Sequence, residues 1–159
     1  MSVQIRQKNP RWMEQFKTRL KQQCKEEVAV GFPKEAGKAI SAHYENGASV
    51  LVVAVLNNFG TETIPRRPFM DNAAHKLQEN FKNMVKATQK KVNSGELTPR
   101  TVLKAAGLES EGIVRDEITN GNFVPNSPAT ADAKGSSRPL IDSGDMRKYV
   151  TSVVRGRTR

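Results

Sequence analysis

Two consecutive helical patterns decide the fold class of this chain: residues 71–95 read DNAAHKLQENFKNMVKATQKKVNSG, and residues 98–118 read TPRTVLKAAGLESEGIVRDEI. Each opens with a residue that can cap a helix, Asp71 in the first and Thr98 before a proline in the second. Apolar side chains then recur at the spacing of one helix face: Ala74, Leu77, Phe81, Met84 and Val85 in the first, and Leu103, Ala106, Val114 and Ile118 in the second. We therefore predict two helices, the second weakened by its two glycines unless these allow a neighbour to pack closely.

Two short apolar segments precede these helices and favour strands. Residues 28–32 read VAVGF and are closed by Pro33, while residues 49–56 read SVLVVAVL, a continuous apolar run that demands cover on both faces. A hairpin with a long loop over residues 37–47 would pair them. Together these elements predict an α+β fold, with a small antiparallel or mixed sheet packed against two to three helices and a long extended arm.

Each end of the chain adds a further element. Residues 9–27 predict an amphipathic helix, because apolar side chains recur every four residues at Trp12, Phe16, Leu20 and Cys24. Residues 140–154 predict a short helix or turn followed by a strand. We therefore divide the chain into an N-terminal helix (1–27), an α+β core (28–118), an extended arm or loop (119–139), and a C-terminal helix or strand with a basic tail (140–159).

Two loops stand out by their prolines. Residues 119–139 read TNGNFVPNSPATADAKGSSRP, a segment with three prolines and few apolar side chains. Such a segment should be poorly ordered alone, and we expect it to become ordered against a partner. In residues 57–70, Pro65 and Pro68 restrict the backbone and so lower the entropy cost of docking. For Phe69, a core position and an interface position are both open.

The chain is strongly basic. Its 159 residues contain 26 Lys and Arg against 16 Asp and Glu, a formal charge of +10, and the basic residues gather in residues 6–25 and 147–159. These ends are either a solvated helix face with a basic tail or a surface that contacts phosphates. No run of about 18 apolar residues and no secretory leader pattern occurs, so we expect no membrane contact and synthesis in the cytoplasm of the producing cell.

Residues that carry chemistry are sparse. The serines and glycines match no nucleophile elbow, P-loop or dinucleotide fingerprint. Cys24 lies on the apolar stripe, which favours a small buried side chain, and His43 and His75 have no metal-ligating or catalytic partners in the pattern. Asp142 and Asp145 flank Ser-Gly, which favours a turn with a helix cap over a pair of catalytic acids. We therefore expect no catalytic residue, no cofactor, no metal and no enzymatic activity.

Two segments resemble a known family. Residues 56–70, LNNFGTETIPRRPFM, are similar to the N-x-F-G-T…I-P-x-R-P-F segment of neck and tail-completion proteins of tailed bacteriophages. Residues 121–130, GNFVPNSPAT, and residues 134–147, KGSSRPLIDSGDMR, resemble the P-N-S-x-x-T…K-G-x-x-x-P-L-I-D-T-G-x-L-R segment of the same proteins. Ser143 and Met146 stand where threonine and leucine are usual.

The resemblance implies a structural protein of the virion, located at the head–tail junction as a neck, minor tail or tail-completion subunit. Such subunits form rings, commonly sixfold or twelvefold, around the channel through which DNA passes. The implied partners are further copies of the chain, the head connector, the tail terminator, and the tail tube or sheath proteins. The motif positions taken as interface candidates are Phe59, Gly60, Thr61, Ile64, Pro65, Arg67, Pro68, Phe69, Pro125, Thr130, Lys134, Pro139, Leu140, Asp142, Gly144 and Arg147.

A second function remains open. The two basic ends would also suit a module that binds nucleic acid without reading its sequence, although no recognised DNA-binding pattern accompanies them.

Overall fold

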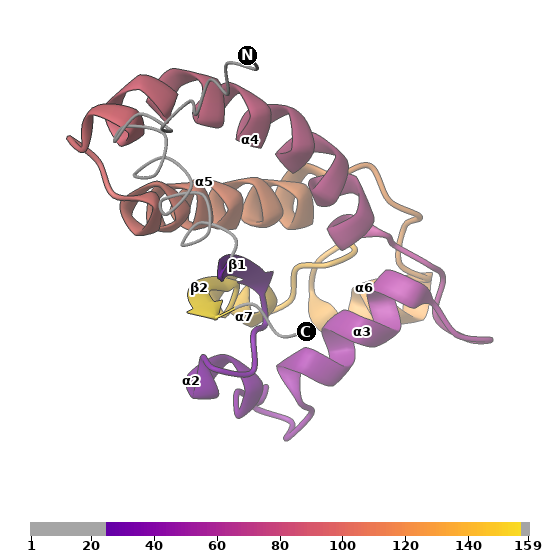
Figure 1. The fold of residues 1–159 in the computed structure, drawn as a ribbon. Coiled ribbons are helices and arrows are strands. Elements are labelled where there is room, and N and C mark those ends of the chain that lie inside the picture. The colour runs from indigo at the N-terminus through magenta and orange to yellow at the C-terminus, as the bar shows by residue number, and fades with distance from the viewer. Residues whose placement is uncertain (1–24, 157–159) are drawn as a thin grey trace, which may run out of the picture.

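The structure is a computed structural model that describes residues 25–156, and a pair of long helices dominates it (Figure 1). Helix α4 (Phe69–Ser94) and helix α5 (Pro99–Asn120) lie side by side and are joined by a short turn. Strands β1 (Glu26–Gly31) and β2 (Thr151–Gly156) both pack on α5, so this helix lies between α4 and the sheet. The remaining elements are the helices α2 (Gly37–Ile40), α3 (Val50–Phe59), α6 (Pro128–Lys134) and α7 (Asp145–Lys148).

The α+β class is confirmed, and the sheet is antiparallel. Its two strands come from opposite ends of the described chain, with Val28 opposite Val154 and Val30 opposite Ser152. Residues 28–31 were correctly assigned to a strand, and so were the short helix and strand near the C-terminus. Because β1 pairs with β2, the segments 28–118 and 140–156 share one core.

The predicted strand at residues 49–56 is wrong, because this segment forms α3. The Ser49 hydroxyl accepts a hydrogen bond from the backbone N–H of Val52 at 3.5 Å and so caps the helix. One face of α3 is buried, and it carries Val50, Ala54 and Asn58 at intervals of four residues. A continuous apolar run has no period of its own, so periodicity alone could not separate this helix from a buried strand.

The two long helices form as their sequences predict, with one change at the start of α4. The Thr98 hydroxyl caps α5 by accepting from the backbone N–H of Thr101 at 3.1 Å. Helix α4 begins two residues before Asp71, so Asp71 lies in its first turn and does not cap it. Gly95, with φ of 83°, ends α4 in the left-handed conformation expected of a C-terminal glycine.

The predicted N-terminal helix at residues 9–27 falls almost wholly outside the described residues. Its last two residues, Glu26 and Glu27, belong to β1, so a helix cannot extend to Glu27. The arm at residues 119–139 is not extended throughout: Asn120 ends α5, and α6 forms within the arm with Ser127 as its N-cap.

The buried core is built from α3, α4, α5 and α7 and from the segments that connect them. Phe69, Val50, Val114 and Val150 are fully buried, and Ala54, Ala73, Ile118, Leu140 and Met146 pack with them. The open question about Phe69 is therefore answered, since this side chain is a core residue. Within residues 25–156, no helix is both long and apolar enough to cross a membrane.

Gly107 sets how closely α5 approaches the sheet. A Cβ atom added at this glycine would lie 2.6 Å from Ser152 Oγ and 3.1 Å from Val28 Cγ2. Gly112 on the same helix has nothing within 4 Å of such an atom. Close packing of the sheet therefore explains the glycine at position 107. This is the alternative that the sequence analysis left open for the glycines of this helix.

We predict that Gly107→Ala lowers the free energy of unfolding by about 1–3 kcal/mol, because overpacking outweighs the gain in helix propensity. Gly112→Ala is the matched control and should raise it by up to about 1 kcal/mol, since only the propensity changes. Chemical denaturation followed by circular dichroism measures both. Equal stabilisation by the two substitutions would show that α5 and the sheet are not in close contact at Gly107.

Candidate interface around Arg67

The two motif segments meet at the side chain of Arg67, which is only 5% exposed. Its Nε donates to the carbonyl oxygen of Val124 at 3.0 Å, and its Nη2 donates to the carbonyl oxygen of Pro125 at 3.3 Å and to Oδ1 of Asn126 at 3.1 Å. Its Nη1 donates to Oδ1 of Asn57 on α3 at 2.7 Å. One guanidinium therefore ties the arm to α3 and to the loop that leads into α4.

The oxygens that receive these four bonds are all uncharged, two from the backbone and two from asparagine amides. Burial lowers the pKa of Arg67, since removal from water disfavours its charged form. The planar guanidinium offers five donors in a fixed fork, which suits several separate acceptors better than an ammonium group does. The site therefore serves to hold segments in place.

The loop before Arg67 is shaped by its own motif residues. The Thr61 hydroxyl accepts from the backbone N–H groups of Thr63 and Ile64, the latter at 2.9 Å. Gly60 has φ of 77°, and a Cβ atom there would lie 3.0 Å from the backbone N of Arg66. The side chain of Asn58 accepts from the backbone N–H of Met70 at 3.0 Å. This part of the motif therefore encodes a fixed turn between α3 and α4.

The candidate interface residues separate into three groups by exposure. The buried ones are Arg67, Phe69 and Leu140, whose side chains stabilise the fold from within. The half-buried ones are Gly60, Ile64, Pro68, Lys134, Pro139 and Gly144. The exposed ones, which a partner could contact directly, are Phe59, Thr61, Pro65, Pro125, Thr130, Asp142 and Arg147.

An apolar stripe on α3 was missed from the sequence. Val52, Val55 and Phe59 are 53%, 46% and 67% exposed, and their spacing places them along one side of the helix. Helix α3 contains no charged residue. Reading this segment as a helix would have revealed the stripe, because its apolar residues are too many for a single buried face. We call Val52, Val55 and Phe59 the α3 stripe.

The arm adds a further apolar side chain near the end of α3. Val124 is 54% exposed, and its carbonyl oxygen bonds to the same guanidinium that reaches Asn57. Ordering of the arm against a partner stays a prediction; within the chain, residues 124–126 are held by Arg67. The exposed side chain of Val124 and the α3 stripe thus lie on segments that the bonds of Arg67 connect.

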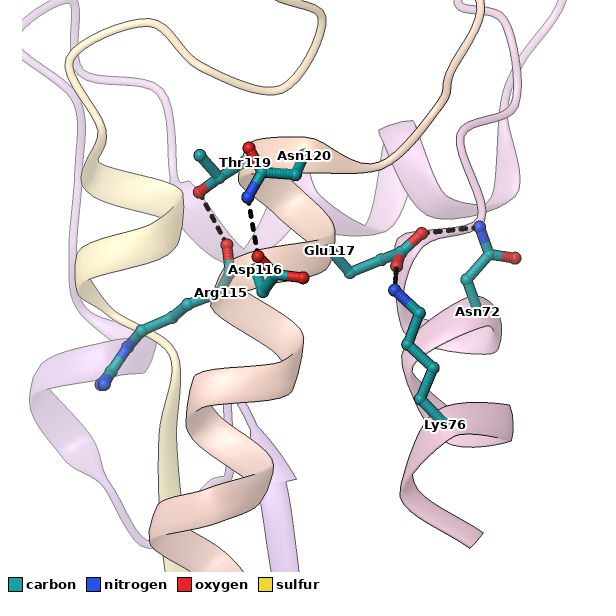
Figure 2. Close-up of polar contacts among 7 residues, drawn as sticks. All are labelled: Asn72, Lys76, Arg115, Asp116, Glu117, Thr119 and Asn120. Carbon is teal, nitrogen blue, oxygen red and sulfur yellow. Dashed lines mark hydrogen bonds and ion pairs between the residues drawn. The ribbon is translucent and has the colours of Figure 1, made fainter. Parts of the chain in front are cut away.

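A buried carboxylate connects the two long helices on another part of the molecule. Figure 2 shows Glu117 of α5 accepting from Nδ2 of Asn72 at 2.9 Å and from Nζ of Lys76 at 2.6 Å, both on α4. The bond to Glu117 raises the pKa of Lys76. Both oxygens of the carboxylate are thus used to hold α4 against α5.

The turn around Asp142 and Asp145 faces the phenol of Tyr44. Burial, followed by the negative charges of Asp145 and Asp142, raises the pKa of Tyr44 to about 12. Gly144 adopts φ of 86° at the start of α7, and Asp145 lies in the first turn of this helix. The two aspartates therefore belong to a turn that starts a helix, as expected, but neither of them caps it, because the N-cap is Gly144.

Among residues 25–156, no group of three or more His, Cys, Asp or Glu side chains is placed to bind a metal ion. Comparison with protein-family models, with curated proteins and with solved structures finds nothing that matches this chain.

We predict that Arg67→Ala lowers the free energy of unfolding by about 2–4 kcal/mol, because the four hydrogen bonds of a buried guanidinium are lost at once. Arg66→Ala is the matched control: Arg66 is exposed, its ion pair with Asp71 lies at the surface, and the loss should stay below about 1 kcal/mol. Urea denaturation measures both values. Equal small losses would mean that Arg67 does not hold the arm.

We also predict that Tyr44 titrates at about pH 12 in the folded chain, well above its ordinary pKa of 10.0. Because the folded pKa is raised, the contribution of Tyr44 to stability is complete below pH 10 and is lost as the pH rises towards 12. Tyr44 and Tyr149 are the two tyrosines of the chain, so tyrosinate absorbance of the Tyr149→Phe variant reports Tyr44 alone. A midpoint near pH 10 in the folded variant, equal to that in denaturant, would contradict the burial of this phenol.

Proposed function

We propose that this chain is a structural subunit of a phage head–tail junction, where it forms a neck or tail-completion ring that joins the head connector to the tail. The observation that carries the proposal is the α3 stripe, an exposed and uncharged surface. It lies directly before the motif loop that Arg67 anchors. The resemblance of both motifs to neck proteins supports the same function.

The geometry suits assembly better than chemistry. Exposed apolar side chains that sit together on a monomer mark contacts with other proteins. A contact between this surface of one copy and a different surface of the next is heterologous, and it closes into a ring when the rotation divides a full turn. Sixfold or twelvefold closure is the expectation from the resemblance. Connector, tail-terminator and tail tube or sheath proteins would then cover the remaining faces, and the virion is the proposed location.

Function as a non-enzymatic subunit fits the way in which the described polar groups are used. The buried carboxylate of Glu117 and the buried guanidinium of Arg67 both bond to neighbouring segments of the same chain. Each joins helices or loops and thereby fixes the shape of the molecule. Rigid surfaces lower the ordering cost of association, which suits a subunit that must join several neighbours.

Sequence-independent binding of nucleic acid is the second candidate, and one observation favours it. Lys82, Lys86 and Lys90 are exposed on α4 at four-residue spacing, so they form a row along the helix. Among the C-terminal basic residues, Arg155 is less available, because it forms ion pairs with Glu27 and Glu35, each at 2.9 Å. DNA affinity that falls steeply with salt would support this candidate.

We predict that replacing both Val55 and Phe59 by Asp abolishes ring formation and leaves a folded monomer. Both side chains are exposed, so the fold tolerates the change, whereas two carboxylates would have to be buried in the assembled contact. Native mass spectrometry and electron microscopy of the chain mixed with connector and tail proteins of the same particle measure the assembly.

Leu108→Asp is the control, because Leu108 is 68% exposed but belongs to α5 and not to the α3 stripe. This variant should assemble as the unsubstituted chain does. Normal rings from the double variant would exclude the α3 stripe as the contact. Failure of the unsubstituted chain to join any junction assembly, combined with salt-dependent DNA binding, would favour the second candidate.

A further inference from the structure

The apolar face of α4 is wider than α5 can cover. Leu77, Met84 and Val92 are half-buried or buried along this face, where α4 packs on α5. Phe81 and Val85 remain 44% and 42% exposed. Ala74 is exposed as well, and at 100° per residue these three side chains fall on one flank of the helix. We call Ala74, Phe81 and Val85 the apolar flank.

The apolar flank lies on the side of the helix pair from which the sheet approaches. The opposite side is a groove lined by Lys76 and Asn80 of α4 and by Glu109 and Asp116 of α5. On α5, Gly107 points away from this groove and towards Val28 of β1. Because α4 and α5 are antiparallel neighbours, the face of α4 turned away from the groove is on the same side as Gly107. The apolar flank therefore lies on the side of α4 that faces the contact between α5 and β1.

The first described residues of the chain lie beside this contact between α5 and β1. Lys25 directly precedes β1, and Glu26 accepts a hydrogen bond from Arg100 in the first turn of α5. This turn follows the C-terminal end of α4 after a short connection. The chain before Lys25 has 24 residues, enough to run back along α4 past Val85 and Phe81. Residues 9–24 would span about 24 Å as a helix, close to the distance from Val92 to Ala74 along α4.

We propose that residues 9–24, which lie outside the described residues, pack on the apolar flank of their own chain. Their apolar side chains recur every four residues at Trp12, Phe16, Leu20 and Cys24, the pattern of a helix with one apolar face. The direct link to β1 gives this segment a high effective concentration at the flank, which favours it over the same segment of a second copy. The inference is independent of the ring function.

The charges around the apolar flank permit this occupant. Residues 9–24 are basic, so a row of lysines facing them would repel them. At 100° per residue, the polar residues of α4 next to the flank include Gln78, Gln89 and, in the first turn of the helix, Asp71. Lys82, Lys86 and Lys90 lie further round the helix. The basic side chains of the segment can therefore point to solvent while its apolar side chains contact Phe81 and Val85.

The tryptophan content of the chain provides a direct test. Trp12 is the only tryptophan, so fluorescence quenching by acrylamide reports the exposure of this segment in the full-length protein. In the unsubstituted chain, we expect Trp12 to be shielded compared with the chain in denaturant. In the Phe81→Gln/Val85→Gln variant, the quenching constant should rise to the value measured in denaturant, while circular dichroism stays unchanged.

Leu108→Gln is the matched control, because it removes an exposed apolar side chain from α5 outside the flank and should leave Trp12 shielded. Shielding of Trp12 that survives the double substitution would overturn the proposal, and so would full quenching in the unsubstituted chain. Shielding that is lost on dilution would also overturn it, since the occupant would then be a second copy. If the double variant loses its circular dichroism signal, the single Val85→Gln variant replaces it, with the same rise in quenching expected in part.

Discussion

The buried guanidinium of Arg67 imposes the constraint on which the shape of the candidate interface depends. A positive charge removed from water must have its donors satisfied, and here the acceptors come from α3 and from the arm. The acceptors in the arm lie up to 59 positions from Arg67 in the sequence, so only the fold brings them together. The end of α3, the motif loop and residues 124–126 are thereby held in one fixed arrangement. Exposed apolar side chains on these segments form the surface that we propose for contact with another protein.

Helix α5 supplies the frame in which that arrangement sits. One side of α5 receives α4, with the buried Glu117 bonded to Asn72 and Lys76, and another side receives the sheet at Gly107. The sheet itself closes the chain, because its strands come from the two ends of the described segment. A frame of this kind leaves α3 and the arm on the outside, where they can contact neighbours without disturbing the core.

The helices and strands differ in how well the sequence alone predicts them. The helices α4 and α5 were predictable because each has a regular apolar period, joined in α5 by the cap at Thr98. Helix α3 was not, because its apolar residues follow one another without a period, and the sequence alone favoured a strand. The pairing of β1 with β2 joins distant residues, so no local pattern reveals it. For the candidate site, the motifs singled out Arg67 but not its role, since burial and partners across a long separation are properties of the folded chain.

The central claim is that Arg67 fixes the arm and α3 within one chain so that the α3 stripe can meet a neighbouring subunit. An electron cryo-microscopy map of the purified phage junction tests this most directly. We predict density for this chain in a closed ring, with Val52, Val55 and Phe59 buried against the next copy and the Arg67 bonds to Val124 and Asn57 kept within each chain. A ring in which the α3 stripe faces solvent, or a junction without this chain, would contradict the claim.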